Sequence, residues 1–360
     1  MPVFDRHFWL IVVSGATLGL LGVLLAVWGN PDNSGICVSC FVENSAGALG
    51  LHDNPRMQYI RPELIGFVFG AILSSRLLGE FRSRGGSAVM PRFFSGLFLI
   101  VGCAVFIGCP IKLFLRLTAG DLTALVGLAG LIIGVWFGIR SLAAGVHLGR
   151  SEKQRDGSGL WVPALFLLLL VLVLVKPAFV RFSVTGSAAL HAPALISLAA
   201  GLFLGFLAQR SRFCVTASIR DFLLMGRRAP LIWGLFAFFI VATATSVASG
   251  GFNFGYYGQP GSHHDVFWSL LGMALVGWLS VIIGGCPFRQ LIKAGEGDSD
   301  AGMVVLGMLV GGGVVQSWEI AATAAGVNSF GKVAVLVGIA FVIILTLFYR
   351  ERGTVPGSAT

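Results

Sequence analysis

Charged residues are scarce in this 360-residue sequence, at 11%, whereas hydrophobic residues make up 56% and the mean hydropathy is +0.88. Soluble globular domains contain about 25% charged residues, so this composition excludes a water-soluble fold of ordinary type. Long apolar runs recur throughout and leave no room for a sizeable soluble domain between them. The whole chain is therefore expected to be one membrane unit.

Three other features are missing. The sequence holds no nucleotide-binding motif, so any transport would be passive or ion-coupled. Its six histidines have no spacing that builds a metal site, and most of its six cysteines lie in apolar stretches rather than in a secreted disulfide pattern. The net charge of +9 lies largely in short loops, where Lys and Arg set membrane topology. We expect no cofactor, no metal and no nucleic-acid partner, and we expect the lipid bilayer to surround the chain.

The fold class predicted is an all-α polytopic membrane protein with about ten spanning helices and short re-entrant helices. Apolar runs of about 20 residues have the length that crosses a bilayer core. The first run lacks a clear cleavage site and is longer than a signal-peptide core, so it is expected to be a retained helix. The ten runs are 8–28, 62–79, 93–111, 122–140, 160–180, 190–208, 231–250, 266–285, 301–318 and 331–349.

The distribution of Lys and Arg between loops predicts the orientation, because positively charged short loops stay in the cytoplasm. A model with cytoplasmic N- and C-termini separates these residues well. The segment 251–266, on the opposite side, contains no Lys or Arg. The cytoplasmic set is Arg82, Arg84, Arg92, Arg150, Lys153, Arg155, Arg210, Arg212, Arg227, Arg228, Arg350 and Arg352. The minority set is Arg56, Arg61, Lys112, Arg116, Lys176, Arg181 and Lys332.

A motif of glycine, cysteine and proline followed by two basic residues occurs twice, at Cys109 and at Cys286, 177 residues apart. The same offset places the segment at Cys37 on the segment at Cys214 without a gap. Two separated matches in one register indicate an internal repeat. We divide the chain into a first membrane repeat, 1–180, and a second, 181–360, within one integrated transmembrane domain.

About five spans in each half would put the second repeat into the membrane with opposite polarity. Such inverted repeats are typical of transporters and channels, whose sites lie where discontinuous helices of the two repeats meet near the bilayer midplane. The duplication therefore bears on function as well as on fold.

The Gly-Cys-Pro motif predicts that a helix begins at each cysteine, because proline suits the first turn and cysteine then occupies the cap. Each preceding span would break inside the membrane, which is tolerated where the backbone is buried or lines a cavity. A helix N-terminus attracts anions. Free cysteines are often simply small buried hydrophobes, but repetition in the same context favours a functional role for Cys109 and Cys286.

Two basic residues follow each motif, spaced four apart on one helical face: Lys112 with Arg116, and Arg289 with Lys293. Charges in apolar sequence are costly unless they are used or paired. These four residues could support an anion site. The alternative is that they extend to the membrane interface or pair with aspartates further along, Asp121 and Asp298.

Cys37 and Cys214 lie in segments 34–50 and 211–225, which are too polar and too short to span and are predicted to be re-entrant. The alternative is a plain interfacial loop. Cys40 makes a Cys-x-x-Cys pair with Cys37, but the other repeat has Ala217 there, so a redox pair is only a side hypothesis. Cys103 aligns with Ser280 and is expected to serve packing.

At these residues the chain resembles the YeeE/YedE family of bacterial inner-membrane proteins over nearly its full length. The motifs are Gly35-Ile36-Cys37, Gly108-Cys109-Pro110, Arg212-Phe213-Cys214 and Gly285-Cys286-Pro287. The segments around Cys37 to Phe41, Ala46 to His52, Tyr59 to Glu63, Ala208 to Arg212 and Gly295 to Asp298 resemble the selenium-associated YedE branch.

The resemblance implies uptake of a thiosulfate-like anion or a selenium species. It implies a central path of cysteines, which here would be Cys37, Cys109, Cys214 and Cys286, with an accessory role for Cys40 in binding selenium. It also implies a small TusA-like sulfur-carrier protein as a separate partner, because this sequence contains no such domain.

The sequence therefore predicts a transporter, not an enzyme, for a small sulfur- or selenium-containing anion. Thiols suit soft sulfur and selenium, and basic residues with helix ends offset the lost hydration of the anion. The main alternative is a membrane thiol redox protein or persulfide/selenide relay. A soft-metal transporter is disfavoured by the basic residues, and a scaffold without cargo by the cysteine and basic pairs.

Overall fold

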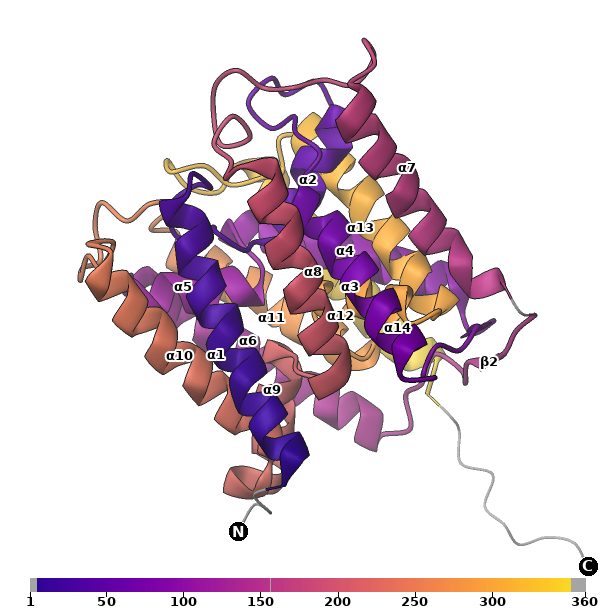
Figure 1. The fold of residues 1–360 in the computed structure, drawn as a ribbon. Coiled ribbons are helices and arrows are strands. Elements are labelled where there is room, and N and C mark those ends of the chain that lie inside the picture. Colours follow the sequence, from indigo (N-terminus) through magenta and orange to yellow (C-terminus); the bar gives the residue numbers. More distant parts are fainter. Residues whose placement is uncertain (1–4, 156, 351–360) are drawn as a thin grey trace, which may run out of the picture.

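The computed structural model describes residues 5–155 and 157–350, whose regular secondary structure is almost entirely helical (Figure 1). Two short strands, β1 (Arg84–Gly85) and β2 (Glu152–Lys153), pair antiparallel, and two 3₁₀ turns cover Ser158–Leu160 and Gly226–Arg228. The helices are α1 (Arg6–Val27), α2 (Val38–Ala48), α3 (Pro62–Leu77), α4 (Val89–Phe106), α5 (Pro110–Thr118), α6 (Thr123–Ala143), α7 (Trp161–Val175), α8 (Ala194–Ser211), α9 (Val215–Met225), α10 (Pro230–Ala248), α11 (Val266–Ile282), α12 (Pro287–Gly295), α13 (Ser299–Ser317) and α14 (Ser329–Phe348).

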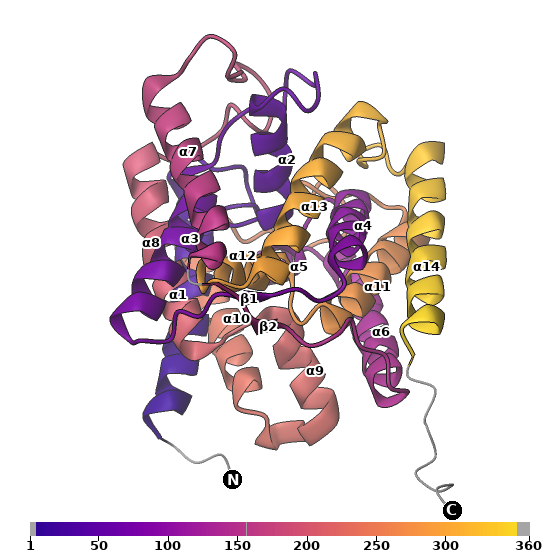
Figure 2. The ribbon, with the colours of Figure 1, turned by 90° about the vertical axis from the view of Figure 1, so that its right-hand side faces the viewer.

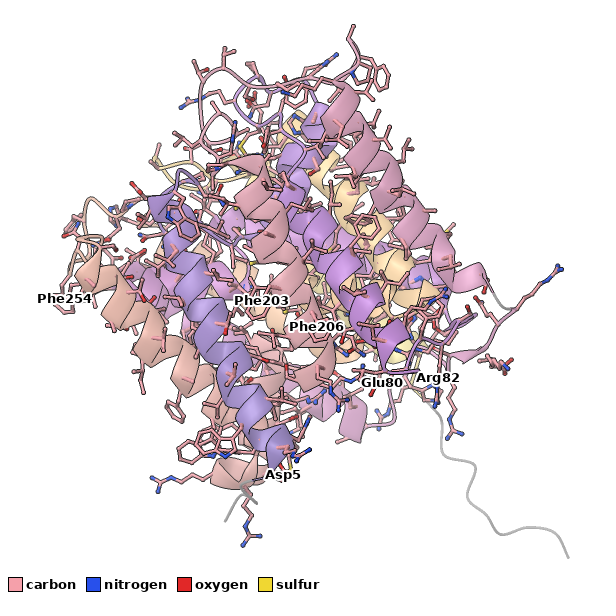
Figure 3. The ribbon with its side chains drawn as sticks, viewed as in Figure 1. Asp5, Glu80, Arg82, Phe203, Phe206 and Phe254 are labelled. Carbon is pink, nitrogen blue, oxygen red and sulfur yellow. The ribbon has the colours of Figure 1, made fainter. Side chains whose placement is uncertain are left out.

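The prediction of an all-α polytopic membrane protein is confirmed. Nine helical segments of the described chain are long and apolar enough to cross a membrane. Each of the ten predicted runs overlaps a helix of the structure. Nine of these helices belong to the nine segments above, and the remaining one is α3, whose 16 residues make it shorter than any of those segments. Apolar side chains stand on the outer faces, such as Phe203 of α8, which is 53% exposed (Figure 3).

The two Gly-Cys-Pro motifs break the helices where the sequence predicts. Helix α4 ends at Phe106, Ile107 turns into the left-handed region with φ 60°, and α5 begins at Pro110. Between α11 and α12 the position 177 residues further on, Gly284, is also left-handed with φ 79°. A left-handed residue ends a helix and frees the chain to begin another in a new direction. The prediction that a helix begins at each of these cysteines is therefore confirmed.

Helices of the two halves correspond at the 177-residue offset. It carries the bounds of α2 onto α9 and of α5 onto α12 without change, and it carries α4 onto α11 to within one residue. The closest helix packing follows the same rule: α1 packs on α10 and α3 on α8, while α4 packs on α13 and α6 on α11. At the 177-residue offset the pair of α1 and α10 corresponds to the pair of α8 and α3, and the pair of α4 and α13 corresponds to the pair of α11 and α6. The major contacts therefore join the first half to the second with pseudo-twofold symmetry.

Glycines allow this close packing. A Cβ added to Gly130 of α6 would lie 2.2 Å from the carbonyl oxygen of Leu270 in α11. One added to Gly307 of α13 would lie 1.9 Å from the carbonyl oxygen of Phe93 in α4. Both members of the second contact lie at the same 177-residue offset from those of the first, so backbone approaches backbone at equivalent places.

The two short helices α2 and α9 lie toward opposite ends of the bundle, with α5 and α12 between them (Figures 1 and 2). Segments 34–50 and 211–225 are thus helical, and the plain interfacial loop is the wrong alternative for them. The start of α1 and the end of α14 lie at the α9 end (Figure 2). Helices α2, α5 and α12 are buried over most of their length, whereas α9 is buried only in its first half and Leu224 near its end is 58% exposed.

Candidate functional site

Four of the six cysteines occupy the same position, the N-cap of a half-length helix. Cys37 caps α2, Cys109 caps α5, Cys214 caps α9 and Cys286 caps α12. All four are at most 1% exposed. A helix N-terminus carries free amide protons and a partial positive charge, so each thiol stands at a site that favours an anion.

The structure brings the four cysteines together as one pair from each repeat. The sulfur atoms of Cys214 and Cys286 are 3.4 Å apart. Cys37 and Cys109 also interact directly through their thiols. Cys109 acts electrostatically on Cys286, so the two pairs are neighbours inside the bundle.

The first pair is richer in thiols than the second. The Cys40 backbone N–H donates to the Cys37 sulfur at 3.4 Å, and the Cys40 side chain is half-buried beside it. The Cys37 sulfur also lies 3.4 Å from the Ser39 hydroxyl oxygen, and that hydroxyl interacts with Cys103. Cys103 packs in the core as predicted, and it lies beside the cluster formed by Cys37 and Ser39.

Three of the four basic residues predicted near the cysteines are paired with carboxylates. Arg116 contacts Asp121 at 2.7 Å, and the equivalent pair in the other repeat, Lys293 with Asp298, lies at 3.7 Å. The third, Arg289, contacts Glu296 at 3.1 Å. The alternative of pairing with Asp121 and Asp298 therefore holds for Arg116 and Lys293, whereas Arg289 pairs with Glu296, a partner that the sequence did not indicate.

Lys112 differs from the other three. It is 3% exposed and forms no ion pair or hydrogen bond with any side chain in the described ranges. Its equivalent, Arg289, pairs with Glu296, but the position equivalent to Glu296 is Ala119. A buried ammonium without a carboxylate partner carries an uncompensated desolvation cost. Lys112 acts electrostatically on the Cys37 and Cys40 thiols, so its charge lies near them.

Glu43 of α2 is a buried carboxylate near the first thiol pair that the sequence motifs did not single out. This side chain is 4% exposed, and one carboxylate oxygen accepts a hydrogen bond from the Gln316 amide at 2.6 Å. The equivalent position in the second repeat is Arg220, which pairs with Asp221 at 2.7 Å. The signal available in the sequence was this exchange of an acid for a base at equivalent positions.

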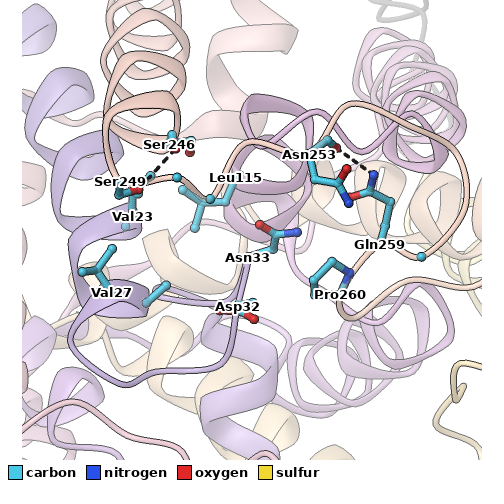
Figure 4. Close-up of a pocket in the computed structure, with 15 residues that line it drawn as sticks. Val23, Val27, Asp32, Asn33, Leu115, Ser246, Ser249, Asn253, Gln259 and Pro260 are labelled. Carbon is cyan, nitrogen blue, oxygen red and sulfur yellow. Dashed lines mark hydrogen bonds between the residues drawn. The ribbon is translucent and has the colours of Figure 1, made fainter.

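A pocket of about 470 Å³ opens where α1 and α10 end (Figure 4). Its lining includes Asn33, Leu115 of α5 and Gln259, whose amide donates to the Asn253 carbonyl oxygen at 2.8 Å. The adjoining loop reaches Lys112, because a Cβ added to Gly261 would lie 2.9 Å from its ammonium nitrogen. The pocket and the buried ammonium are thus separated by one short loop.

His263 belongs to that same loop, which the distribution of Lys and Arg predicts to lie on the outer side of the membrane. The residue is 3% exposed, and its Nε2 lies 2.7 Å from the carbonyl oxygen of Val105, at the end of α4. Its Nδ1 accepts from the Asp265 backbone N–H, so Nε2 holds the proton and donates it to Val105. Burial lowers the pKa of His263 below its ordinary value of 6.5. The histidine therefore fastens the loop to the broken helix as a neutral group.

The comparisons with known proteins bear on the second half of the chain. No curated protein matches the sequence. The matched segment contains Cys214 and Cys286, the two thiols that lie 3.4 Å apart, together with helices α9 to α14. Residues 210–353 match the model of a family described as sulphur transport, which supports the YeeE/YedE resemblance and, with it, a membrane transporter of sulfur species.

Proposed function

We propose that this protein carries a small sulfur- or selenium-containing anion inward across the bacterial inner membrane, through the interface between its two halves. The path would follow Cys37 and Cys109 and then Cys214 and Cys286. The observation that carries the proposal is the buried ammonium of Lys112, which has no carboxylate partner in the described chain and acts on the Cys37 thiol. An anion supplies the missing charge.

The arrangement suits a soft anion in three ways. The four helix N-termini offer unsatisfied amide protons in place of water. The ammonium of Lys112 offsets part of the cost of removing an anion from water. Thiols make weak hydrogen bonds and contacts with polarisable sulfur or selenium, which hold the anion without preventing its release.

The cargo favoured by the resemblance is a selenium species, with thiosulfate as the sulfur counterpart. The additional thiol of Cys40 in the first repeat supports the selenium assignment, because the second repeat has Ala217 at this position. A separate sulfur-carrier protein of the TusA type would receive the cargo in the cytoplasm. The pocket near Asn33 and Gln259 would be the approach from the outer side.

One observation favours a second candidate, a thiol redox or persulfide relay. The 3.4 Å between the Cys214 and Cys286 sulfur atoms is short enough for the two thiols to act on one sulfur atom together. A relay would form a covalent intermediate that can be trapped on a cysteine. It would give no uptake into sealed vesicles, which separates it from a transporter.

The test is uptake of labelled thiosulfate, selenite and selenide into proteoliposomes by the parent and by the Cys109→Ala and Cys286→Ala variants. We expect uptake of at least one anion by the parent and its loss in both variants. The control is Cys103→Ser, which installs the residue of the other repeat and should keep most of the uptake. Equal uptake by parent and both alanine variants would refute the cysteine path, whereas a trapped adduct without uptake would favour the relay.

A further inference from the structure

Glu43 is a buried carboxylate on the thiol-rich side of the site. It lies six residues beyond Cys37 on α2, which is about 9 Å along the helix at 1.5 Å per residue. Its side chain is 4% exposed, and within the described ranges no Lys, Arg or His side chain forms an ion pair with it. A carboxylate in such a place is stabilised by holding a proton, since burial penalises its charged form.

We propose that Glu43 is a proton-binding site that couples the entry of a proton to the uptake of the anion. The inference rests on the proposed transport function and supplies its coupling ion. It assigns to the chain a second ligand, the proton, with a site of its own next to the path.

The hydrogen bonds of Glu43 connect it to the surface. One carboxylate oxygen accepts from the Gln316 amide nitrogen at 2.6 Å. The amide oxygen of Gln316 in turn accepts from the Asn54 side chain at 2.8 Å. Gln316 and Asn54 are both half-buried, at the end of α13 and in the loop that follows α2. Glu43 is therefore separated from the loop surface by a single amide side chain, which places it within reach of a proton from that side.

The charged and titratable groups around Glu43 come from several elements. Lys112 of α5 and Cys37 at the start of α2 act on the Glu43 carboxylate electrostatically. The charge of Glu43 in turn acts on the thiols of Cys40 in α2 and Cys103 in α4. Helix α13 presents only neutral Gln316, and the neighbouring helices α3 and α12 contribute no titratable group that acts on Glu43. The ring of His52 contacts the backbone carbonyl of Glu43, with Nε2 3.0 Å from that oxygen, rather than the carboxylate.

The coupling follows from competition for one cation. When the path is empty, Lys112 stabilises the charged form of Glu43. When an anion binds beside Lys112 and Cys37, a charged Glu43 would repel it, so the anion binds best to the protonated form. Linkage makes the effect mutual: the anion draws a proton onto Glu43, and departure of the anion toward Cys286 lowers the proton affinity of Glu43. The proton reaches the inner water because this departure follows the switch of the transporter to its inward-facing state.

The second repeat has no carboxylate at the position equivalent to Glu43. Its equivalent residue is Arg220, paired with Asp221 at 2.7 Å, so no unpaired carboxylate adjoins the Cys214 and Cys286 pair at that position. The carboxylate site thus belongs to the α2 end alone, which is the outer end in the predicted orientation. A site on one side loads the proton where the anion enters.

The experiment measures labelled thiosulfate and selenite in proteoliposomes in two modes. The first is exchange between equal pH values, which needs the path but no coupling. The second is accumulation driven by an acidic exterior, which for one proton per anion rises about tenfold for each pH unit. The variants are Glu43→Gln, which can still accept from Gln316, and Asp53→Asn, which removes a carboxylate that is 87% exposed and belongs to the loop after α2.

We expect Glu43→Gln to keep exchange within about twofold of the parent, which also shows that it folds, and to lose both the acid-driven accumulation and the acidification of the vesicle interior. Asp53→Asn should keep both. Two results in the parent would overturn the proton site: exchange without acid-driven accumulation, or accumulation driven by sodium instead. Two results in Glu43→Gln would also overturn it: full coupling, or loss of exchange. All four would leave the transport proposal standing. Absence of all exchange in the parent would refute the transport function itself.

Discussion

At the scale of single residues, one missing carboxylate defines the site. Arg116 and Lys293 occupy equivalent positions and both pair with the aspartate five residues further on, at 2.7 and 3.7 Å. Lys112 and Arg289 are also equivalent, but only Arg289 has a glutamate seven residues on. Replacement of that glutamate by Ala119 leaves the charge of Lys112 available to a ligand. The symmetry of the repeat makes this departure visible.

Substitution of Lys112 should therefore separate function from folding. In Lys112→Met we expect anion uptake to fall about tenfold or more, equivalent to about 1.4 kcal/mol of lost anion binding, because the buried positive charge is gone. Folding should be unimpaired, since removal of an unpaired buried charge also removes its desolvation cost. Proteoliposome uptake and thermal unfolding in detergent measure the two effects.

The matched variant is Arg116→Met, one helical turn away on α5. It leaves Asp121 buried without its partner, which costs about 3 to 5 kcal/mol of folding stability. We expect a marked fall in the yield of folded protein rather than a pure loss of transport. If Lys112→Met destabilised the fold as much as Arg116→Met does, Lys112 would have a structural role and the anion site would be wrongly placed.

The sequence was sufficient to predict much of the site, because its signals are local. The Gly-Cys-Pro tripeptide specifies a cap and a first turn, and both Cys109 and Cys286 occupy that cap. Which of the basic residues would be paired could not be predicted, since the partner of Arg289 depends on how α12 ends at Glu296. The burial of Glu43 depends on Gln316, 273 residues away, and no local pattern reports it.

At the scale of helices and loops, the apolar runs predicted the spans well because length and hydropathy alone decide them. Glycine positions decide which helices pack together. In the sequence they indicate that a helix packs closely, but they do not identify the helix that it packs against. Gly307 is an example. Alanine has the higher helix propensity and would be favoured at this position of α13, yet its Cβ would lie 1.9 Å from the carbonyl oxygen of Phe93 in α4.

We expect Gly307→Ala to destabilise the protein by about 2 kcal/mol or more, because α13 and α4 must move apart. The control is Gly251→Ala in a loop, where the nearest atom to the added Cβ is 3.7 Å away and the change should stay within about 0.5 kcal/mol. Unfolding midpoints of the two purified variants provide the comparison. A stabilised Gly307→Ala variant would show that α4 and α13 are not in backbone contact.

The loop 251–265 should respond to pH through His263. The pKa of this histidine is lowered in the folded protein, so below about pH 6.5 the opened loop takes up a proton more readily than the closed one. Attachment of the loop is therefore at full strength above that pH and weakens as the pH falls. Hydrogen exchange of the loop amides, corrected for intrinsic rates, should increase between pH 7.5 and 5.5. In His263→Gln this dependence should vanish; an unchanged dependence would exclude the histidine as its cause.

At the scale of the whole molecule, the two halves form one packed unit whose main helix contacts cross between them. Repeats of opposite polarity, arranged in this way, suit alternating access around a central site. The start of α1 and the end of α14 lie at the same end of the bundle as α9, and the arginines of the 226–228 turn follow α9 directly (Figure 2). This charge distribution favours that end as the cytoplasmic one.

Epitope insertion tests the orientation. A tag placed in 251–265 should be labelled from outside intact cells, whereas a tag before α1 should be labelled only after the membrane is opened. The reverse pattern would place the α2 end and Glu43 on the cytoplasmic side. The proposed direction of proton and anion entry would then be wrong.

The central claim is that a soft anion passes between the capping thiols, and selenium offers a direct way to locate it. Crystals of the protein soaked with selenosulfate, the selenium analogue of thiosulfate, would be measured at the selenium absorption edge. The account predicts an anomalous peak inside the bundle, about 3.5 to 4 Å from the sulfur atoms of Cys109 or Cys286 and on the side of Lys112. Selenium peaks confined to the surface in a protein that takes up selenosulfate would contradict it.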